Sequence, residues 1–294
     1  VCKGGVCAGK KLGLLYGGSQ SEEAAALVAA DGGFVLAGYT QSQGAGQRDA
    51  WLVRTDKDGK RLWDKTFGGP GNDSAAALVR LADGHLVFAG HRDAALGVAG
   101  ADAWLVRTDR DGKVVFDVAY PAATDAAALA LTVAGDGFAL AGEVQAAGGK
   151  GPRDGQVIRV DGKGKLVWEQ AFGGAADDAA VAVVGLGDGG LALCGYTESM
   201  GAGLSDAWLV RTGANGSTQA WAQAFGGKQA DVCNSLVALP DGFALAGYTQ
   251  SEGAGKSDLW LIRTDSNGKS LWSKTFGTPE LDGGEALAVL KDGG

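Results

Sequence analysis

Carboxylate side chains recur at regular spacing along the chain, and they are the first residues to consider for chemistry. Paired carboxylates can cleave glycosidic bonds, and carboxylate clusters can hold cations. Asp side chains also accept hydrogen bonds from loop amides, and we favour that role here, with an acidic rim for a cation or a basic partner as the alternative. One series is Glu22, Asp73, Asp125, Asp178, Asp231 and Asp282, and a second is Asp49, Asp102, Asp154, Asp206 and Asp258.

Arginines accompany the second series, five residues after each acid, at Arg54, Arg107, Arg159, Arg211 and Arg263. Because a buried charge needs a partner, we expect these arginines to pair with some of the acids of the two series.

Two short turns resemble part of a calcium-binding loop, Asp56-Lys-Asp-Gly59 and Asp109-Arg-Asp-Gly112. An EF-hand loop places oxygen ligands at alternating positions, a glycine sixth and a carboxylate twelfth, which these turns do not. The corresponding segment Gly213-Ala-Asn-Gly216 has no carboxylate at all. We therefore predict hairpin turns and no metal site.

The chain has only two histidines, His85 and His91, and neither lies in a nucleophile motif. His85 falls at the place where other parts of the chain have Phe34 and Phe243, which favours a packing role. The four cysteines and two histidines lack the close paired spacing of a zinc site. We predict no catalytic, cofactor-binding or metal-binding residues.

The cysteines fall into two pairs. Cys194 and Cys233 replace alanines of the other repeats, which favours two small buried residues and leaves a disulfide as the alternative. Cys2 and Cys7 lie in a glycine-rich leading segment, where a local disulfide and two unlinked cysteines are equally favoured. Such a bridge suits an oxidising compartment, so we expect a secreted, periplasmic or cell-surface protein.

A repeat of about 52 residues positions all these side chains. The string Asp49-Ala-Trp-Leu-Val-Arg-Thr-Asp56 recurs with spacings of 53, 52, 52 and 52 residues. Each unit contains four short apolar runs separated by Asp-Gly or Asn-Gly turns; we name them A (for example 75–79), B (86–90), C (49–56) and D (62–69). Such turns favour β-hairpins, and four strands per repeat of this length predict an all-β fold, a β-propeller of four-stranded blades.

The eight tryptophans occupy two positions of this repeat. A packing residue must recur wherever blades meet, whereas a binding residue rarely recurs in every blade, so we predict that they form the core between blades. They are Trp51, Trp104, Trp208 and Trp260 in run C, and Trp63, Trp168, Trp221 and Trp272 in run D.

The pattern Asp-x-Trp-Leu-Val-Arg-Thr-Asp…Leu-Trp-x-Lys-Thr-Phe-Gly-Gly resembles the propeller repeat of bacterial and archaeal secreted or surface proteins. It is also similar to the tryptophan motif of quinoprotein-type propellers. The resemblance covers the chain beyond residue 10 and implies the fold. A quinone cofactor and calcium would be implied only with a matching central site, and no cofactor-cage motif is present.

Counting the runs gives five complete blades and a partial sixth. Residues 1–10 form a Gly/Cys-rich lead, and residues 11–294 form one propeller domain. The sixth blade has an outer strand at 11–16 and an inner strand at 285–290, and it lacks its runs B and C. We expect either further residues, about 25 by repeat length, or a partner segment that completes this blade.

A binding function is favoured, with a protein or glycan partner on the loops between runs B and C, because loops on a rigid scaffold carry function. Three loops share Gly-Ala-Gly, which suits a repeating glycan, and two diverge, which suits a protein. The alternative is an enzyme of quinoprotein-like or glycan-cleaving type. The net charge of −8 argues against nucleic acid, and no apolar run is long enough to span a membrane. The candidate loop residues, besides the first acid series from Asp73 onward, are Thr40, Gln41, Gln43, Thr197, Glu198, Thr249, Gln250 and Glu252.

Overall fold

The computed structural model describes residues 2–3, 6–7, 14–93, 100–122, 124–145 and 153–290. Five four-stranded antiparallel sheets account for most of them, and β1 (Cys2–Lys3) pairs with β2 (Val6–Cys7) in a separate two-stranded sheet. No helix in the described part of the chain is long and apolar enough to cross a bilayer. The chain is therefore all-β, as predicted.

Each large sheet is one blade, and its four strands follow one another in the chain. Blade 1 contains β3 (Glu22–Ala30), β4 (Gly33–Thr40), β5 (Asp49–Asp56) and β6 (Arg61–Phe67). Blade 2 contains β7 (Asp73–Arg80), β8 (Leu86–Asp93), β9 (Ala101–Thr108) and β10 (Val114–Tyr120). Blade 3 contains β11 (Ala126–Ala134), β12 (Gly137–Gln145), β13 (Arg153–Val160) and β14 (Leu166–Phe172). Blade 4 contains β15 (Asp178–Gly185), β16 (Leu191–Thr197), β17 (Asp206–Thr212) and β18 (Gln219–Phe225). Blade 5 contains β19 (Asp231–Leu239), β20 (Gly242–Thr249), β21 (Asp258–Asp265) and β22 (Ser270–Phe276).

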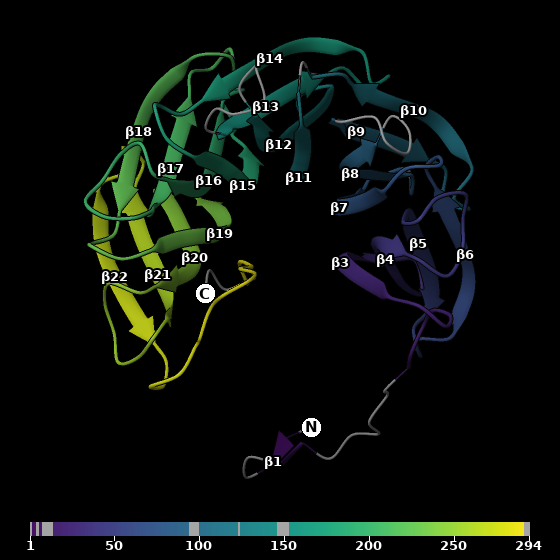
Figure 1. Ribbon diagram of the computed structural model, residues 1–294, viewed down its shortest axis with the longest axis horizontal. Helices are drawn as coiled ribbons and strands as arrows, with labels where there is room; N and C mark the ends of the chain where they lie inside the picture. Colours follow the sequence, from purple (N-terminus) through teal and green to yellow (C-terminus); the bar gives the residue numbers. More distant parts are fainter. Residues whose placement is uncertain are drawn as a thin grey trace.

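The five blades stand around a common centre in an open ring (Figure 1). The first strand of every blade (β3, β7, β11, β15 and β19) faces the centre, and the last strand lies at the outer edge. The four strands of a blade are thus runs A, B, C and D from the inside outward. The predicted propeller of five complete four-stranded blades is confirmed.

A glycine in strand B is explained by a bulge in strand A. In blade 2 the register of β7 against β8 shifts between Ala75 and Ala77, opposite Gly90. A Cβ on Gly90 would lie 1.9 Å from the carbonyl oxygen of Ser74, so no side chain fits there. The same close approach occurs at the matching glycine of every blade, which accounts for the Leu-Ala-Gly repetition of run B.

The acidic turns that resemble calcium loops are C–D hairpin turns. The Oδ1 atom of Asp56 accepts hydrogen bonds from the backbone N–H groups of Asp58 and Lys60, both at 2.9 Å. Gly59 has φ of 80°, the left-handed conformation that glycine adopts without strain. The predicted hairpin turns are confirmed, and the first carboxylate stabilises the turn.

Tryptophans fill the contacts between blades. In strand C, Trp104 and Trp208 are 0% and 1% exposed. In strand D, Trp168 packs on the C–D turn of the next blade, where a Cβ on Gly216 would lie 2.7 Å from the indole Cζ2. Trp63 meets Gly112 in the same way. The predicted role of the tryptophans as core between blades is confirmed where two described blades meet, but not for Trp272, which is 41% exposed.

The strand-C arginines do not pair with the two acid series, contrary to our expectation. Arg107 bonds Asp83 at 3.0 Å and Arg211 bonds Asp188 at 2.5 Å, and both aspartates lie in A–B turns. The physical reason is strand length: the arginine is five residues beyond the acid that opens strand C, so it reaches the opposite end of the blade.

His85 was predicted to occupy the packing position of Phe34, and that prediction is wrong. Strand pairing places Leu86 there, and Leu86 is 1% exposed. His85 lies one residue earlier, beside the A–B turn, where Arg107 Nε donates to its Nδ1 at 3.1 Å. The turn before β8 is one residue longer than the turn before β4, so our alignment of His85 with Phe34 was displaced by one residue.

The ring is open between blades 5 and 1 (Figure 1), and the surfaces that face this opening are apolar. Leu27 of β3 is 59% exposed, whereas Leu78 at the same position of β7 is 8% exposed. At the other side of the opening, Trp272 and Phe276 of β22 are 41% and 53% exposed. Both surfaces have the sequence of a contact between blades but lack the neighbouring blade.

The two segments expected as lone strands of a sixth blade have no strand structure in residues 14–21 and 283–290. Each lacks the adjacent strand that would complete its hydrogen-bond ladder. They nevertheless keep the contacts of the repeat. The Asp282 N–H donates to Ser257 O at 2.8 Å, as Asp231 N–H donates to Ser205 O at 2.8 Å. Tyr16 Oη donates to the Gly59 carbonyl of the next blade, matching the bond from Tyr120 to Gly164.

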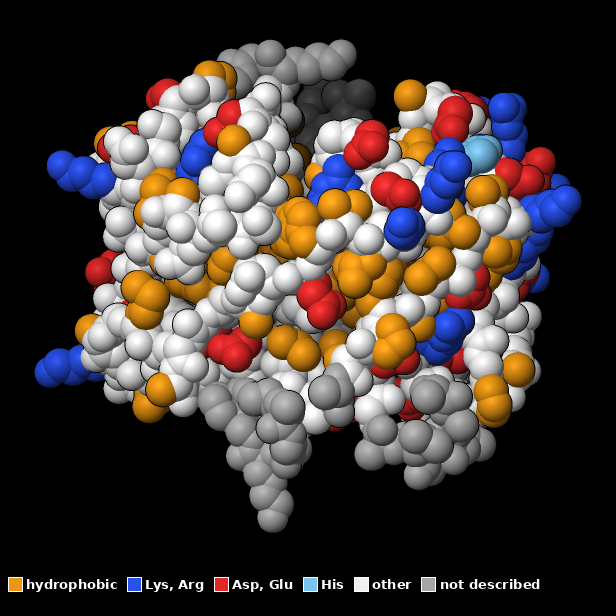
Figure 2. All heavy atoms as spheres, turned by 90° about the horizontal axis from the view of Figure 1, so that it is seen from above, with side chains coloured by type: hydrophobic (Ala, Val, Ile, Leu, Met, Phe, Trp, Pro, Cys, Tyr) orange, Lys and Arg blue, Asp and Glu red, His pale blue; other side chains and the backbone are white. Residues whose placement is uncertain are grey.

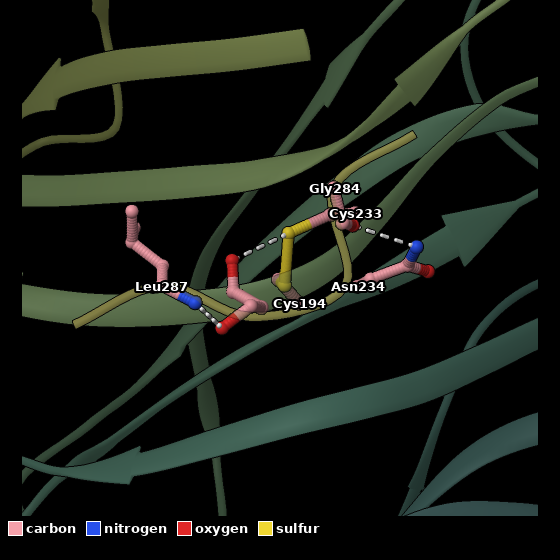
Figure 3. Close-up of a disulfide and its surroundings, with 6 residues drawn as sticks. Cys194, Cys233, Asn234, Gly284 and Leu287 are labelled. Atoms are coloured by element: carbon pink, nitrogen blue, oxygen red, sulfur yellow. Dashed lines mark hydrogen bonds between the residues drawn. A yellow bond between two sulfur atoms is a disulfide. The ribbon is translucent and has the colours of Figure 1, made fainter. Parts of the chain in front are cut away.

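Cys194 of β16 and Cys233 of β19 form a disulfide between blades 4 and 5, with Cα atoms 5.8 Å apart (Figure 3). We favoured two unlinked small residues, so the preferred interpretation is wrong, although both side chains are indeed buried. Strand B of one blade meets strand A of the next at these positions, and alanines make the corresponding contact elsewhere. Beside the bridge, Asn234 Nδ2 donates to Gly284 O at 3.0 Å and holds the segment after β22 (Figure 3). The backbones of Cys2 and Cys7 are paired, and their side chains lie outside the described residues.

Hydrophobic residues also lie at the outer edge of the ring. Figure 2 views this edge over β10 and β14 and shows hydrophobic side chains in the middle of the surface, with charged side chains around them. Val115 is 52% exposed and Val167 is 58% exposed. The outer strands therefore leave apolar side chains in contact with solvent.

Replacing Trp168 by alanine should lower the free energy of unfolding by about 3–5 kcal/mol, because it empties a packed aromatic site between blades 3 and 4. Trp272→Ala is the matched control at the same repeat position without a following blade, and it should cost about 1 kcal/mol or less. Urea denaturation followed by circular dichroism measures both. Equal losses for the two variants would contradict the assignment of Trp168 to the core between blades.

Candidate functional site

The two ends of the blades form two different faces of the ring. The D–A and B–C loops emerge on one face, which we call the loop face, and the A–B and C–D turns emerge on the other, the turn face. Both acid series lie at the loop face, because one opens strand A and the other opens strand C.

Three of the six acids in the strand-A series are buried. Asp73, Asp178 and Asp231 are each 0% exposed. Asp231 accepts hydrogen bonds from Gly227 N at 2.8 Å and Ser251 Oγ at 2.6 Å, and also from Thr249 Oγ1. The carboxylate thus ties the D–A loop before its strand to the B–C loop of the same blade. Burial raises the pKa of Asp73, against the backbone hydrogen bond from Gly69 that lowers it.

The acids that open strand C hold the B–C loops. Asp49 accepts from Ala45 N and Gly46 N, and Asp258 accepts from Ala254 N and Gly255 N, at 3.0 to 3.2 Å. Burial and the nearby charge of Asp178 raise the pKa of Asp154. These contacts are the loop-amide role that we favoured for the series.

The predicted loop residues separate into buried and accessible groups. Thr40, Thr197 and Thr249 are 0–1% exposed, and Thr197 Oγ1 accepts from the Ser199 and Met200 amides. They therefore support the loops from inside and, like the buried Asp73, Asp178 and Asp231, are not accessible to a partner. The structure brings threonine and acid together within a blade, as in the bond from Thr249 to Asp231. It also places the acid that opens strand A near the acid that opens strand C of the preceding blade, as with Asp178 and Asp154. Gln43, Asp125, Glu198, Gln250 and Glu252 are exposed, and Gln41 and Asp282 are half-buried.

Asp125 differs from the rest of its series. Strand pairing aligns Ala126, not Asp125, with Asp73 and Asp231, and Ala126 is 3% exposed. Asp125 lies one position earlier, where its Oδ1 accepts from Ala101 N at 2.9 Å. Blade 3 therefore lacks the buried carboxylate of blades 2, 4 and 5, and its acid faces solvent.

A pocket of about 570 Å³ opens on the loop face beside blades 1, 2 and 3. Its position is explained by a change in the repeat: strand B has Tyr39, Tyr196 and Tyr248 in blades 1, 4 and 5, and the smaller His91 and Glu143 at this position in blades 2 and 3. The polar groups that line the pocket are Arg48, Asn72, His91, Asp93, Asp125, Glu143, Gln145 and Arg153.

Sequence reasoning treated the repeated positions as the candidates and missed this pocket. The signal that could have found it is departure from the repeat. Arg48 and Arg153 stand where blades 4 and 5 have Ser205 and Ser257, next to the acid that opens strand C. Their convergence with His91 required the ring geometry.

The polar groups of the pocket are largely paired with one another. Ser74 Oγ lies 3.1 Å from His91 Nδ1, and burial lowers the pKa of His91. Arg153 forms an ion pair with Glu143. The Arg48 guanidinium stacks over the Tyr39 ring at 4.0 Å, and its buried Nε has no hydrogen-bond partner among the described residues. The pocket thus presents a cation on an aromatic platform.

Ser74 and His91 form a hydrogen-bonded pair, but within the described ranges no carboxylate bonds the imidazole to orient it. The nearby Asp93 instead accepts from the backbone and side-chain amides of Asn72. Among the residues that the structure describes, no group of three or more His, Cys, Asp or Glu side chains is placed to hold a metal ion.

Comparisons with known proteins support the fold. No protein-family model and no curated protein matches the sequence. Among solved structures, the WD40 domain of Neurospora crassa Pan2 is similar with a TM-score of 0.51 and 12% identity, over 87% of this chain and 66% of that one. Sqt1 from Chaetomium thermophilum has a TM-score of 0.48 and 15% identity, over 88% of this chain and 61% of that one. The tricorn protease has a TM-score of 0.46 and 12% identity, over 84% of this chain and 26% of that one. The chain thus spans about two thirds or less of these structures, and the likeness to Pan2 shows a WD40-like β-propeller fold.

The burial of His91 predicts a pH dependence of stability. Its folded-state pKa lies below the ordinary value of 6.5, so the unfolded chain binds more protons as the pH falls through 6.5. The wild type should therefore lose stability relative to His91→Gln between about pH 7.5 and pH 5.5. Urea denaturation of both proteins across this range measures the effect, and a difference that stays constant would contradict it.

Proposed function

We propose that this protein is a non-catalytic binding propeller that holds a protein partner on its loop face. The observation that carries the proposal is the pocket beside blades 1–3, where residues that depart from the repeat converge. Most of its polar groups are held in place, by the Arg153–Glu143 ion pair and by the bonds of His91 to Ser74 and of Asp93 to Asn72, which fits a preformed recognition site. The accessible loop residues Gln43, Glu198, Gln250 and Glu252 extend the same face around the ring.

An asymmetric protein partner fits this face better than a repeating glycan. Three B–C loops share the Gly-Ala-Gly structure held by Asp49, Asp206 and Asp258. The pocket instead combines Arg48 of blade 1 with residues of blades 2 and 3, the two blades whose loops diverge. A stacked guanidinium such as that of Arg48 is a typical anchor in protein interfaces. We propose that the partner inserts a side chain beside Arg48 and contacts the neighbouring loops.

The proposed setting is outside the reducing cytosol, as a secreted, periplasmic or cell-surface protein. The buried disulfide between Cys194 and Cys233 supports it, because structural disulfides persist in oxidising compartments.

Random dodecapeptides displayed on phage and selected on the immobilised protein test the loop-face proposal. Peptides that are enriched should bind Arg48→Ala/Arg153→Ala at least about tenfold more weakly than wild type by fluorescence anisotropy. Arg110→Ala, which removes an arginine from the turn face, is the matched control and should bind like wild type. Enriched peptides that bind the double variant as well as wild type would refute a site at this pocket.

We also propose that the opening between blades 5 and 1 accepts a β-hairpin that supplies strands B and C of a sixth blade. The exposed Leu27, Trp272 and Phe276 support this, as do the segments around Tyr16 and Asp282, which keep the contacts of outer and inner strands. Two absent strands leave about three inter-strand spacings of 4.8 Å between those segments. The hairpin would carry the Phe-x-Leu-Ala-Gly…Asp-x-Trp-Leu-Val-Arg pattern of the repeat.

A synthetic peptide of residues 242–265 with Trp260→Phe, the strand B–loop–strand C hairpin of blade 5 without its own tryptophan, should occupy this opening. Binding should raise the melting temperature further as the peptide concentration rises, and it should shift tryptophan emission to shorter wavelength as Trp272 is covered. Trp272→Phe should lose most of the emission shift and keep the thermal effect. A peptide of the same composition in scrambled order is the control, and equal effects of the two peptides would eliminate the proposal.

A further inference from the structure

The turn face carries grooves between neighbouring blades, and their sizes differ. The groove between blades 1 and 2 has a volume of about 280 Å³, and the one between blades 3 and 4 about 680 Å³. Arg80 and Arg110 of blade 2 line the small groove. Strand pairing and turn position place Gly185 and Ala214 of blade 4 at the same sites of the large groove. The loss of two long side chains accounts for the added volume.

One wall of the large groove is aromatic and apolar. Trp168 is half-buried, with part of its ring packed on Gly216 and the rest lining the groove beside the exposed Val167. The opposite wall is the A–B turn of blade 4, residues 185–190, whose lining residues are glycines except for Leu186. The groove is therefore wide enough for a ligand ring beside the indole.

The remaining lining groups offer both donors and acceptors at fixed positions. Arg159 Nη2 bonds Asp136 Oδ1 at 3.2 Å. Asp161 Oδ1 accepts from Lys163 N and Lys165 N at 2.9 Å, which lowers the pKa of Asp161 and keeps it ionised. Asn215 Oδ1 accepts from Ser217 N and Thr218 Oγ1. Within the described chain, Asp161 Oδ2 and Asn215 Nδ2 make no hydrogen bond, so an acceptor and a donor remain for a ligand.

The indole, the charges and the free hydrogen-bonding atoms of the groove together restrict the class of ligand that it can bind. An anion would meet the unpaired carboxylate of Asp161, because the Arg159 guanidinium is already paired with Asp136. A metal ion such as calcium needs six or more oxygen ligands, and Asp161 is a single carboxylate. A neutral molecule with many hydroxyl groups can donate to the carboxylate and accept from the amide at once. The C–H face of a sugar ring is apolar and stacks on an indole. We propose that the groove between blades 3 and 4 is a binding site for a neutral hexopyranose unit of a glycan, independent of the loop-face partner.

Titration of uniformly ¹⁵N-labelled protein with maltotriose, cellotriose and chitotriose tests the proposal. At least one trisaccharide should shift the Trp168 indole N–H resonance with a dissociation constant of about 1 mM, an ordinary affinity for a small shallow contact. The Trp168→Phe variant assigns that resonance and should bind about threefold more weakly. Phenylalanine is tolerated structurally at this position, because Phe116 packs on Gly164 in the same way.

Two matched variants decide between this groove and other surfaces. Ala214→Arg restores the arginine of blade 2 and should weaken binding at least about tenfold, because it refills the groove. Ser266→Arg places the same charge at the same turn position of blade 5 and should leave binding unchanged. Both can be followed through the remaining trisaccharide-dependent shifts. No shift of the Trp168 resonance with any of the three sugars, or equal weakening by the two arginine variants, would overturn the proposal while leaving the loop-face test unaffected.

Discussion

The structure depends on one packing constraint: a single blade cannot bury its apolar surface alone. Each sheet is only four short strands wide, and the indole of its outer strand needs the C–D turn of the following sheet to cover it. The glycine in that turn is therefore a packing residue as much as a turn residue, since a Cβ on Gly216 or Gly268 would collide with Trp168 or Trp221. Nearest-neighbour burial of this kind makes the ring a linear array of equivalent contacts.

The same constraint explains how the two faces differ. At the loop face, buried acids such as Asp178 and Asp231 accept hydrogen bonds from loop amides and hydroxyl groups. The loops are therefore held by side chains of the blade itself. At the turn face, surface ion pairs such as Arg159–Asp136 join strand C to the A–B turn. Repeated residues therefore maintain the scaffold. Cavities form where a residue differs from the repeat: His91 and Glu143 line the loop-face pocket, and Gly185 lines the groove between blades 3 and 4.

Strand number and order followed from the sequence because a 52-residue period, Asp-Gly turns and tryptophan positions all depend on local spacing. The sequence did not predict the features that depend on contacts between two blades or on the exact alignment of one blade with another. The Cys194–Cys233 bridge was underrated because its two positions meet only when strand B of one blade faces strand A of the next. His85 was misplaced by one residue because the turn before β8 is one residue longer than the turn before β4. Asp125 was misplaced because the acid of blade 3 stands one residue before the aligned position, in a loop of unchanged length. The pocket around Arg48 and His91 was missed because it joins residues from three blades. A repetitive sequence shows which residues differ from the repeat, but it does not show which of them lie close together in the folded ring.

The disulfide has a consequence for how the array comes apart. In a linear series of repeats the terminal units have one neighbour each and detach first, and blade 5 is such a unit among the described blades. Cys194 and Cys233 are separated by 39 residues, and closing a loop of that length removes about 4 kcal/mol of chain entropy from the unfolded state. The bond joins this end blade to its inner neighbour, and the segment held by Asn234 follows directly after it. Detachment of blade 5 from blade 4 therefore depends on whether the Cys194–Cys233 bond is oxidised or reduced, as well as on temperature.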